Sequence, residues 1–172
     1  EDVAWAVSRA FYIAKSGRPG PVVLDFAKNA QVGLTEYEPV DVDFIRSYDP
    51  DPEIDYKEVA EAVALINSAK KPLALVGQGV ELGNAQQELL AFIENADIPC
   101  GCTILGLSAL PSTHRLNKGM LGMHGNLGPN VKTNECDVLI AIGMRFDDRV
   151  TGKLETYAKH AKVIHLDIDP SE

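Results

Sequence analysis

The sequence predicts an α/β fold: a doubly wound parallel sheet with helices on both faces, preceded by an appendage of one helix and one strand. Two observations predict it. Along residues 56–172, short and wholly apolar stretches, typical of buried parallel strands, alternate with stretches whose apolar residues recur at helical spacing. Residues 33–55 interrupt the pattern, because prolines and acidic residues crowd there without any period. Strands and helices that alternate require right-handed crossovers, which place helices on both sides of a parallel sheet.

The appendage is predicted from the first part of the chain. Helical spacing relates five apolar residues, Val3, Val7, Ala10, Phe11 and Ala14. The stretch KSGRPGP ends this helix, and Arg18 begins a predicted type II turn with Pro19 and Gly20 at its centre. Residues 21–26, PVVLDF, then predict a strand. We interpret residues 1–32 as part of one domain, residues 33–55 as a linker, and residues 56–172 as a second domain.

The second domain is predicted to begin with a helix and to continue with strands and helices in alternation. Asp55 stands in the N-cap position of the first helix, with Glu58 in the capping-box position. Further helices are predicted from Asn84 and over residues 152–161, GKLETYAKHA. Strands are predicted at four places, residues 71–77 (KPLALVG), 98–104 (IPCGCTI), 137–143 (DVLIAIG) and 162–168 (KVIHLDI), and the first and third of these are predicted to be buried.

Composition argues against several classes of function. The chain has 172 residues, of which 45% are hydrophobic and 24% are charged, as in a globular, soluble protein. Its formal net charge of −9 argues against nucleic acid as a main partner. No apolar run approaches the ~20 residues that span a bilayer, so we expect no membrane contact and a cytoplasmic protein. The chain does not begin with Met, and we interpret it as a fragment of a longer protein.

Metal binding is not predicted. The three cysteines, Cys100, Cys102 and Cys136, form a C-x-C pair and leave an odd residue, which argues against a disulfide framework or a four-cysteine zinc site. We expect buried thiols in a reducing compartment. His114, His160 and His165 lack the spacing of metal ligands and are interpreted as structural.

The residues that follow each predicted strand are the candidate site, because ligands of parallel α/β sheets bind beyond the carboxyl ends of the strands. The turn GMRFDDRVTG, residues 143–152, places Arg145 and Arg149 around two aspartates. This turn could hold an anion, or it could be a solvated charge cluster. Gly77, Gln78 and Gly79 could bring the backbone close to a ligand, or they could form a tight strand-to-helix turn.

Each of the other candidate site residues also allows both a functional and a structural interpretation. Asp167 could accept hydrogen bonds from ribose hydroxyls, whereas Asp169-Pro-Ser-Glu172 could simply begin a helix. His124 lies among the glycines of MLGMHGNLGPN and could be a general base, a donor to a ligand or a loop histidine, and without a neighbouring nucleophile the catalytic role ranks last. The guanidinium of Arg18, held on a turn, suits a phosphate or a carbonyl-rich ring, and the alternative is a solvated arginine.

Five stretches together resemble one family. GRPGPVVLD, LGMHG, ECDVLIAIG, RFDDRVTG and HLDIDPSE occur in this order and near these spacings in acetolactate synthase (acetohydroxyacid synthase) large subunits. RFDDRVTG is specific, since other thiamine-diphosphate enzymes share the fold but usually not this string. Essentially the whole chain resembles an internal piece of that enzyme. The piece comprises the last helix and strand of the pyrimidine-binding domain, the linker and most of the central domain.

The resemblance implies that residues 56–172 bind FAD, which does no net redox chemistry in the family's reaction. The anion of the charged turn would then be the diphosphate, or the adjoining ribityl region, of FAD. Three places depart from the family's pattern. Gln78 replaces a glycine, Met144 replaces a small residue, and Ala27-Lys28-Asn29 replaces the frequent Pro-Lys-Asp. The positions that match the family's FAD site are Arg18, Gly77, Gln78, Gly79, Thr103, Ile104, Leu105, Leu121, Gly122, Met123, His124, Gly143, Met144, Arg145, Asp147, Arg149, Val150, Asp167, Ile168, Asp169 and Glu172.

The resemblance also implies the reaction of the full-length enzyme. Pyruvate is decarboxylated on thiamine diphosphate and joined to a second pyruvate or to 2-oxobutyrate, which opens the pathway to branched-chain amino acids. No part of this chain matches the family's catalytic glutamate or its diphosphate–Mg²⁺ domain. We therefore assign no catalytic residue and expect the fragment to be inactive alone. The family forms homo-oligomers of large subunits, and whether a regulatory small subunit binds stays open.

Two alternatives from other classes remain. One is a generic NAD- or FAD-binding module of an oxidoreductase or a sirtuin-like deacylase, although three cysteines cannot supply the four-cysteine zinc site of a sirtuin and a dehydrogenase should show a cleaner glycine fingerprint. The other is a non-catalytic scaffold domain that kept the fold and lost the ligand. Flavin absorbance of the purified protein would separate these alternatives from an FAD-binding segment.

Overall fold

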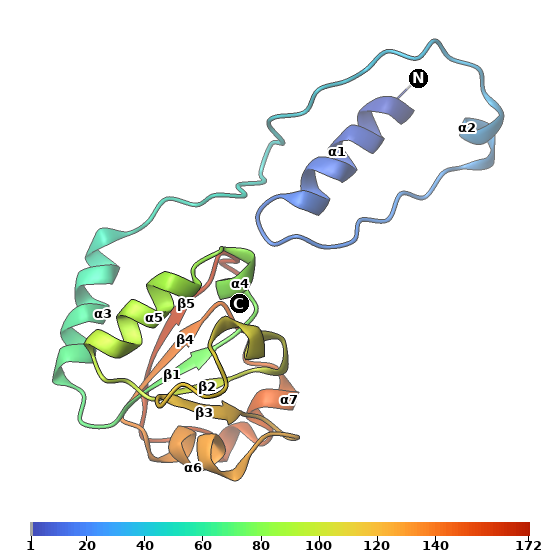
Figure 1. Cartoon of the computed structure of the whole chain (residues 1–172). Coiled ribbons are helices and arrows are strands. Elements are labelled where there is room, and N and C mark those ends of the chain that lie inside the picture. The colour runs from blue at the N-terminus through green and yellow to red at the C-terminus, as the bar shows by residue number, and fades with distance from the viewer. Residues whose placement is uncertain (1) are drawn as a thin grey trace. The chain divides into compact units, whose positions relative to one another are not determined.

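A computed structural model of the chain describes residues 2–172 and divides them into two compact units (Figure 1). The first unit ends at Ile54, and the second spans Asp55–Glu172. The boundary falls at the end of the proline- and acid-rich segment, one residue before the predicted start of the second domain. The assignment of residues 1–32 to a pyrimidine-binding domain and of residues 33–55 to a linker stays a prediction.

The second unit is built on a five-stranded sheet whose strands are all parallel, as predicted. The strands, in order across the sheet, are β3 (Asn117–Met120), β2 (Cys100–Cys102), β1 (Pro72–Val76), β4 (Val138–Ile142) and β5 (Lys162–Leu166). β1 lies at the centre, where Ala74 pairs with Cys100 on one side and with Ile140 on the other. The structure thus confirms the four strands that were predicted in this unit and adds β3.

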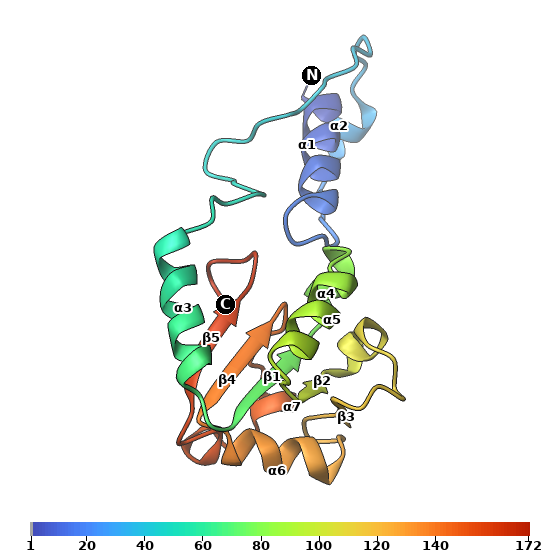
Figure 2. The same ribbon diagram turned by 60° about the vertical axis from the view of Figure 1, so that its left-hand side comes forward.

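Helices cover both faces of this sheet, which confirms the doubly wound fold. Figure 2 shows α3 (Tyr56–Ser68) and α5 (Gln86–Asn95) over one face and α6 (Leu127–Glu135) on the other. Along β1, Ala74 and Val76 join the core cluster that contains residues of α5, whereas Leu73 and Leu75 join a second cluster. Successive side chains of a strand point to opposite faces, so a wholly apolar strand supplies both cores.

The predicted cap of α3 is present. The Asp55 carboxylate accepts hydrogen bonds from the backbone N–H groups of Lys57 (2.8 Å) and Glu58 (3.3 Å), which satisfies two donors that the first helical turn leaves unpaired. The second predicted helix, α5, begins at Gln86 rather than at Asn84. Asn84 has a φ of 52°, a left-handed conformation that asparagine tolerates, and lies between α4 (Gly79–Leu82) and α5.

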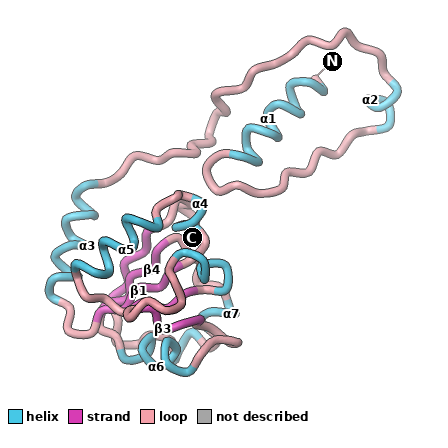
Figure 3. The backbone as a smooth tube through the Cα atoms, viewed as in Figure 1, coloured by secondary structure: helices cyan, strands magenta, loops and turns pink. Residues whose placement is uncertain are grey.

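The first unit contains α1 (Val3–Lys15), as predicted, and α2 (Lys28–Val32), but the predicted strand at residues 21–26 is absent (Figure 3). Val23 is 88% exposed, and no strand among residues 2–54 lies beside this segment. A β-branched sequence favours a strand but cannot form one without a pairing partner. The predicted type II turn is also wrong, because Gly17 (φ 56°) adopts the left-handed conformation and Gly20 does not.

Two segments of the second unit also differ from the prediction. Residues 152–161 form the short 3-10 helix η2 (Leu154–Thr156) and a turn instead of an α-helix. The side-chain oxygen of Asn134 accepts a hydrogen bond from the Ala158 N–H (3.0 Å), which holds this turn. Conversely, β3 and α6 form within a stretch that reads as a glycine-rich loop. The residues of β3, Asn-Lys-Gly-Met, carry no strand pattern of their own, and pairing with β2 makes them a strand.

Short helices occupy the connections that leave the strands: α4 follows β1, η1 (Ile104–Ala109) follows β2, and α7 (Asp148–Thr151) follows β4. These connections bring the predicted site residues of the second unit to the carboxyl edge of the sheet.

The two 13-residue helices, α1 and α3, are far too short to cross a bilayer, and no helix within residues 2–172 is long and apolar enough to do so.

Candidate functional site

The winding of the sheet reverses between β1 and β4. From β1 the chain proceeds sideways through β2 to the outermost strand β3, and from β4 it proceeds in the opposite direction to the outermost strand β5. Gly77 follows β1 and Gly143 follows β4, so the two predicted loops lie side by side at this switch point. Open parallel sheets bind ligands beyond the strand ends at this position.

The glycines of the two loops contact each other directly. The Gly77 N–H donates to the Ile142 carbonyl and the Gly79 N–H donates to the Gly143 carbonyl, both at 2.9 Å. A Cβ on Gly79 would lie 2.6 Å from the Gly143 Cα, and a Cβ on Gly77 would overlap the Gly143 carbonyl oxygen. These glycines are thus required for packing of loop against loop. The interpretation as a tight strand-to-helix turn therefore explains Gly77 and Gly79. The side chain of Gln78, between them, is exposed.

The charged turn after β4 combines a helix cap with two exposed arginines. The Asp147 carboxylate caps α7 by accepting hydrogen bonds from the N–H groups of Arg149 (3.0 Å) and Val150 (3.2 Å). The Arg145 guanidinium, 53% exposed, lies 3.7 Å from Asp147 and 3.9 Å from Glu172. Both distances exceed the ~2.8 Å of a charged hydrogen bond, so these ion pairs are weak. Arg149 is 72% exposed and lies 3.7 Å from Asp148.

The segment after β5 uses its carboxylates to hold its own backbone. Asp167 accepts a hydrogen bond from the Asp169 N–H (3.0 Å), and Asp169 accepts from the N–H (3.0 Å) and hydroxyl (2.6 Å) of Ser171. The cap-like role that the sequence offered for Asp169 is therefore present. Ile168, which lies between them, is 43% exposed. The ion pair of Glu172 with Arg145 joins this segment to the charged turn.

His165 on β5 has a structural role, as its sequence context predicts. Its Nε2 hydrogen bonds with the Met144 carbonyl at 2.8 Å, and its ring meets the Phe146 ring edge to face at 5.2 Å. Met144 is buried in the second core cluster, where its Cβ closely approaches the Gly77 position. Met144 and Gly143 therefore shape the backbone of the candidate site, and Met144 offers it no accessible side chain.

The loop after β3 reaches the charged turn. Leu121 is buried, whereas Met123 and His124 are exposed. Gly122 has a φ of 94°, and the Met123 N–H donates to the Arg149 carbonyl at 2.8 Å. The loop after β3 and the turn after β4 thus form one continuous surface at the carboxyl edge.

Exposed apolar side chains follow β2. Thr103 caps η1 by accepting a hydrogen bond from the Gly106 N–H (3.2 Å). Ile104 and Leu105 directly after it are 70% and 60% exposed. Apolar side chains that a domain holds this far out of its core are available to contact a flat, partly apolar ligand or another part of the protein.

Charge at this edge is mixed. The segments 143–152 and 167–172 contain two arginines and five carboxylates (Asp147, Asp148, Asp167, Asp169 and Glu172), which makes the edge negative on balance. A diphosphate would therefore depend on local donors at Arg145 and Arg149. The carboxylates are suited to accept hydrogen bonds from sugar hydroxyls. Arg18, the remaining predicted residue, lies in the first unit, and the structure leaves its role as a prediction.

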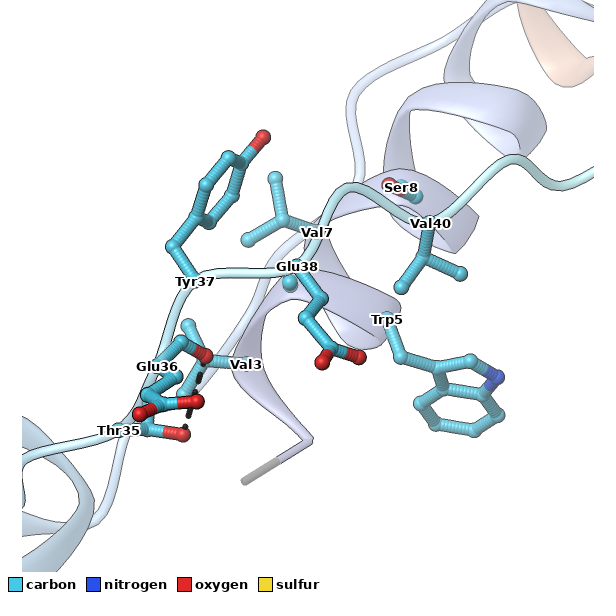
Figure 4. Close-up of a pocket in the computed structure, with 10 residues that line it drawn as sticks. Val3, Trp5, Val7, Ser8, Thr35, Glu36, Tyr37, Glu38 and Val40 are labelled. Atoms are coloured by element: carbon cyan, nitrogen blue, oxygen red, sulfur yellow. Dashed lines mark hydrogen bonds between the residues drawn. The ribbon is translucent and has the colours of Figure 1, made fainter.

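A cavity of about 520 Å³ lies in the first unit, between α1 and residues 35–40 (Figure 4). Its lining includes the aromatic rings of Trp5 and Tyr37 and the carboxylates of Glu36 and Glu38. None of the predicted site residues lines it. A mostly apolar wall with two carboxylates disfavours an anion such as a diphosphate, so this cavity is not the candidate site.

Cys100 and Cys136 are held as protonated thiols, whereas the hydrogen bond with Cys100 lowers the pKa of Cys102. All three are free and buried, as predicted. Burial raises the pKa of the Cys136 thiol to about 11, and a hydrogen bond with Cys102, together with burial, raises the pKa of the Cys100 thiol. These shifts keep Cys100 and Cys136 protonated, and a thiol is a poor nucleophile and metal ligand. Within residues 2–172, no group of His, Cys, Asp and Glu side chains is arranged to hold a metal ion.

Sequence reasoning missed the asparagines that support the edge. Asn130 of α6 exchanges two hydrogen bonds with Gly122, and Asn126 accepts one from the Met120 N–H (3.1 Å). The sequence signal that could have identified them is an asparagine at every fourth position of GNLGPNVKTN. Such spacing places the side chains on one helix face, but the helix itself was not predicted.

Comparison with known proteins places this unit in a family. Residues 59–172 match the family described as the central domain of thiamine pyrophosphate enzymes. The whole chain is 42% identical to the acetolactate synthase isozyme 2 large subunit of Escherichia coli, of which it covers 31%. It is 43% identical over 172 residues to the acetolactate synthase large subunit of Corynebacterium glutamicum, of which it covers 27%. The chain thus spans between a quarter and a third of the length of these relatives.

A solved structure has the same fold. The X-ray structure of a Mycobacterium smegmatis protein assigned as a thiamin diphosphate-dependent enzyme matches with a TM-score of 0.71 at 22% identity. The match covers 99% of this chain and 32% of that protein. At this identity the likeness concerns the fold alone, and it agrees with the parallel α/β architecture.

Proposed function

Because the chain belongs to the family of thiamine pyrophosphate enzyme central domains, we propose that it is the corresponding part of an acetolactate synthase large subunit. The observation that carries this proposal is the identity of 42–43% to such subunits over 99–100% of the chain. The five motifs by which the sequence resembles this family are spread from residue 17 to residue 172. The likeness therefore extends beyond the family domain at residues 59–172.

The proposed reaction is the condensation of two 2-oxo acids with loss of CO₂. The substrates are two molecules of pyruvate, or pyruvate and 2-oxobutyrate, and the products feed branched-chain amino-acid synthesis. Thiamine diphosphate, held with Mg²⁺ by other parts of the full-length enzyme, supplies the decarboxylation and carbon–carbon bond chemistry. We propose that the enzyme is a homo-oligomer of large subunits. None of the residues in this chain is proposed to be catalytic.

The segment itself is proposed to bind FAD at the carboxyl edge of the sheet. The switch point between β1 and β4 supports this location, as does the half-exposed Arg145 that emerges there. A guanidinium can hold a diphosphate with two parallel hydrogen bonds, and Arg149 would support it. Asp167 and Glu172 offer acceptors for ribose and ribityl hydroxyls. Exposed Ile104, Leu105 and Met123 offer apolar contacts for a ring system.

The test is the substitution Arg145→Lys in the full-length enzyme. A lysine keeps the charge and loses the bidentate geometry, so we expect FAD to bind about tenfold more weakly, which corresponds to a loss of ~1.5 kcal/mol of charged hydrogen bonding. FAD is titrated into the apo-protein and its fluorescence is followed.

The matched control is Arg115→Lys. Arg115 pairs with Asp97 at 2.6 Å just before β3 begins, at the amino ends of the strands and away from the candidate site. This variant should therefore bind FAD like the wild type. Equal dissociation constants for the wild type and Arg145→Lys would reject Arg145 as the anchor. A wild-type protein that binds no flavin would favour the scaffold alternative.

A further inference from the structure

Helix α6 presents two asparagines, Asn130 and Asn134, one turn apart, and each holds the backbone of a different segment. The side-chain oxygen of Asn130 accepts a hydrogen bond from the Gly122 N–H, and its side-chain nitrogen donates to the Gly122 carbonyl, both at 2.9 Å. The amide therefore binds both polar groups of one residue, as a neighbouring strand would. Asn134 binds the Ala158 N–H, which belongs to the turn before β5.

Gly122 has a backbone conformation and surroundings that do not accommodate a side chain. Its φ of 94° lies in a region that only glycine adopts readily, and a Cβ at this position would lie 2.8 Å from the Arg149 carbonyl oxygen. The next residue, Met123, donates its N–H to the same carbonyl at 2.8 Å. A continuous chain of contacts therefore runs from the Asn130 amide through Gly122 and Met123 to Arg149 in the charged turn.

We propose that Asn130 is a positioning residue that holds the loop after β3, residues 121–124, against the charged turn after β4. Nothing else in α6 fixes both polar groups of Gly122, although the Gly122 carbonyl also accepts from the Gly125 N–H (3.0 Å). Loss of the amide leaves the part-buried Gly122 N–H without the acceptor that Asn130 supplies. The loop then separates more readily from the Arg149 carbonyl, and the shape of the carboxyl edge changes.

The consequence for the cofactor rests on the proposed FAD site. Met123 and His124 belong to the loop that Asn130 holds, and Arg149 belongs to the turn against which the loop rests. The Asn130 amide lies behind this surface, bonded to backbone groups, so it acts on a ligand through the loop. Removal of the amide should therefore weaken FAD binding by making the bound shape of the edge less populated.

Two substitutions probe the residue, and one serves as a matched control. Asn130→Ala removes both hydrogen bonds. Asn130→Asp keeps an acceptor for the Gly122 N–H but places a carboxylate oxygen against the Gly122 carbonyl, where the amide donated. Asn134→Ala removes an asparagine of the same helix that accepts from the Ala158 N–H and donates to the Asn130 carbonyl, and that forms no hydrogen bond with residues 121–124 in the part of the chain that the structure describes.

The first measurement is backbone hydrogen exchange of the full-length protein without flavin. We expect exchange at Gly122 and Met123 to accelerate about tenfold in Asn130→Ala and in Asn130→Asp, as the loss of about one buried hydrogen bond implies. Asn134→Ala should leave these two amides unchanged and accelerate Ala158. Equal protection of Gly122 and Met123 in the wild type and both Asn130 variants would overturn the proposal.

The second measurement is the FAD dissociation constant, together with the thermal midpoint of each apo-protein. We expect weaker FAD binding, by about fivefold or more, in both Asn130 variants and unchanged binding in Asn134→Ala, even where the thermal midpoints fall equally. If FAD affinity follows the thermal midpoint in all three variants, Asn130 is merely structural and the proposal fails. A wild-type protein that binds no FAD refutes the proposed FAD site, and the exchange result then decides the positioning role by itself.

Discussion

Gly122 illustrates how single residues shape the candidate site. Its positive φ and its closeness to the Arg149 carbonyl both require the absence of a side chain, and its backbone N–H and carbonyl are bound by Asn130. Gly77, Gly79 and Gly143 meet a comparable requirement at the switch point, where two strand exits pack backbone against backbone. Glycine is used in this edge of the sheet chiefly to let protein segments approach one another.

Gly122→Ala is expected to lower the free energy of unfolding by about 1–3 kcal/mol, the usual cost of a non-glycine residue in a strained conformation. The added Cβ would also lie 2.8 Å from the Arg149 carbonyl oxygen, a backbone atom that cannot move away alone. Urea-induced unfolding measures the change.

Gly128→Ala is the matched control, because no atom lies within 4 Å of the added Cβ and the residue belongs to α6. Alanine favours a helix over glycine, so this variant should be as stable as the wild type or more stable by up to ~1 kcal/mol. If both glycine variants unfolded at the same urea concentration, the conformational argument would fail.

At the scale of elements, Asp137 ties the beginning of β4 to its neighbours. Its carboxylate accepts hydrogen bonds from the backbone N–H groups of Lys70 (2.7 Å) and Lys71 (2.8 Å), just before β1. Its carbonyl accepts from the Lys162 N–H (2.9 Å) at the beginning of β5. One residue therefore aligns three adjacent strands at the amino edge of the sheet, opposite the candidate site.

The Asp137 carboxylate should make the stability of this unit depend on pH in the acidic range. The hydrogen bond from the Lys70 N–H, with the one from Lys71, lowers the pKa of Asp137 in the folded protein. Its stabilisation is thus complete above the unfolded-state pKa of ~3.9 and is lost as the pH falls through the lower folded-state pKa. We expect Asp137→Asn to be less stable than the wild type at pH 7 and to lose less stability on acidification.

Urea unfolding between pH 7 and pH 2 measures both effects. Glu88→Gln serves as the control, because Glu88 is an exposed carboxylate in the first turn of α5 with no comparable contact to the backbone. Its curve should parallel that of the wild type. An Asp137→Asn protein whose stability falls as steeply with acid as the wild type would contradict the assigned role.

At the scale of the whole molecule, the chain consists of a thiamine pyrophosphate enzyme central domain and an additional N-terminal unit. It spans 31% of the length of its Escherichia coli relative. Its described residues contain no arranged metal ligands, and its proposed part in the enzyme is structural. A condensation of two 2-oxo acids requires the thiamine diphosphate and Mg²⁺ sites that we propose lie in other parts of the enzyme. The activity is thus expected to be a property of the complete polypeptide.

The isolated 172-residue chain should accordingly form no acetolactate from pyruvate, even with thiamine diphosphate, Mg²⁺ and FAD added. Product formation and pyruvate consumption are measured side by side with the full-length enzyme, which should be active under the same conditions. Turnover of the isolated chain above the protein-free background would refute the assignment of all catalytic groups to other parts of the enzyme.

Much of the second unit could be predicted from the sequence by itself. Wholly apolar runs identified β1 and β4, because a buried parallel strand must be apolar on both faces, and this requirement appears in the local sequence. The order of elements then placed the charged turn and the loop after β1 at one edge of the sheet. The helix cap at Asp55 was equally readable, since it involves residues only two and three positions apart.

Only the tertiary structure decided features that depend on contacts between distant residues. PVVLDF has the composition of a strand but finds no partner within residues 2–54, whereas Asn-Lys-Gly-Met of β3 lacks that composition and becomes a strand by pairing with β2. The sequence left Gly77 open between a ligand loop and a tight turn, and its contact with Gly143 became visible only in the structure. The role of Asn130 likewise depends on the position of α6, which places it beside Gly122. Backbone hydrogen bonds and close packing must be satisfied by whichever segments the fold brings together, and no local pattern records that pairing.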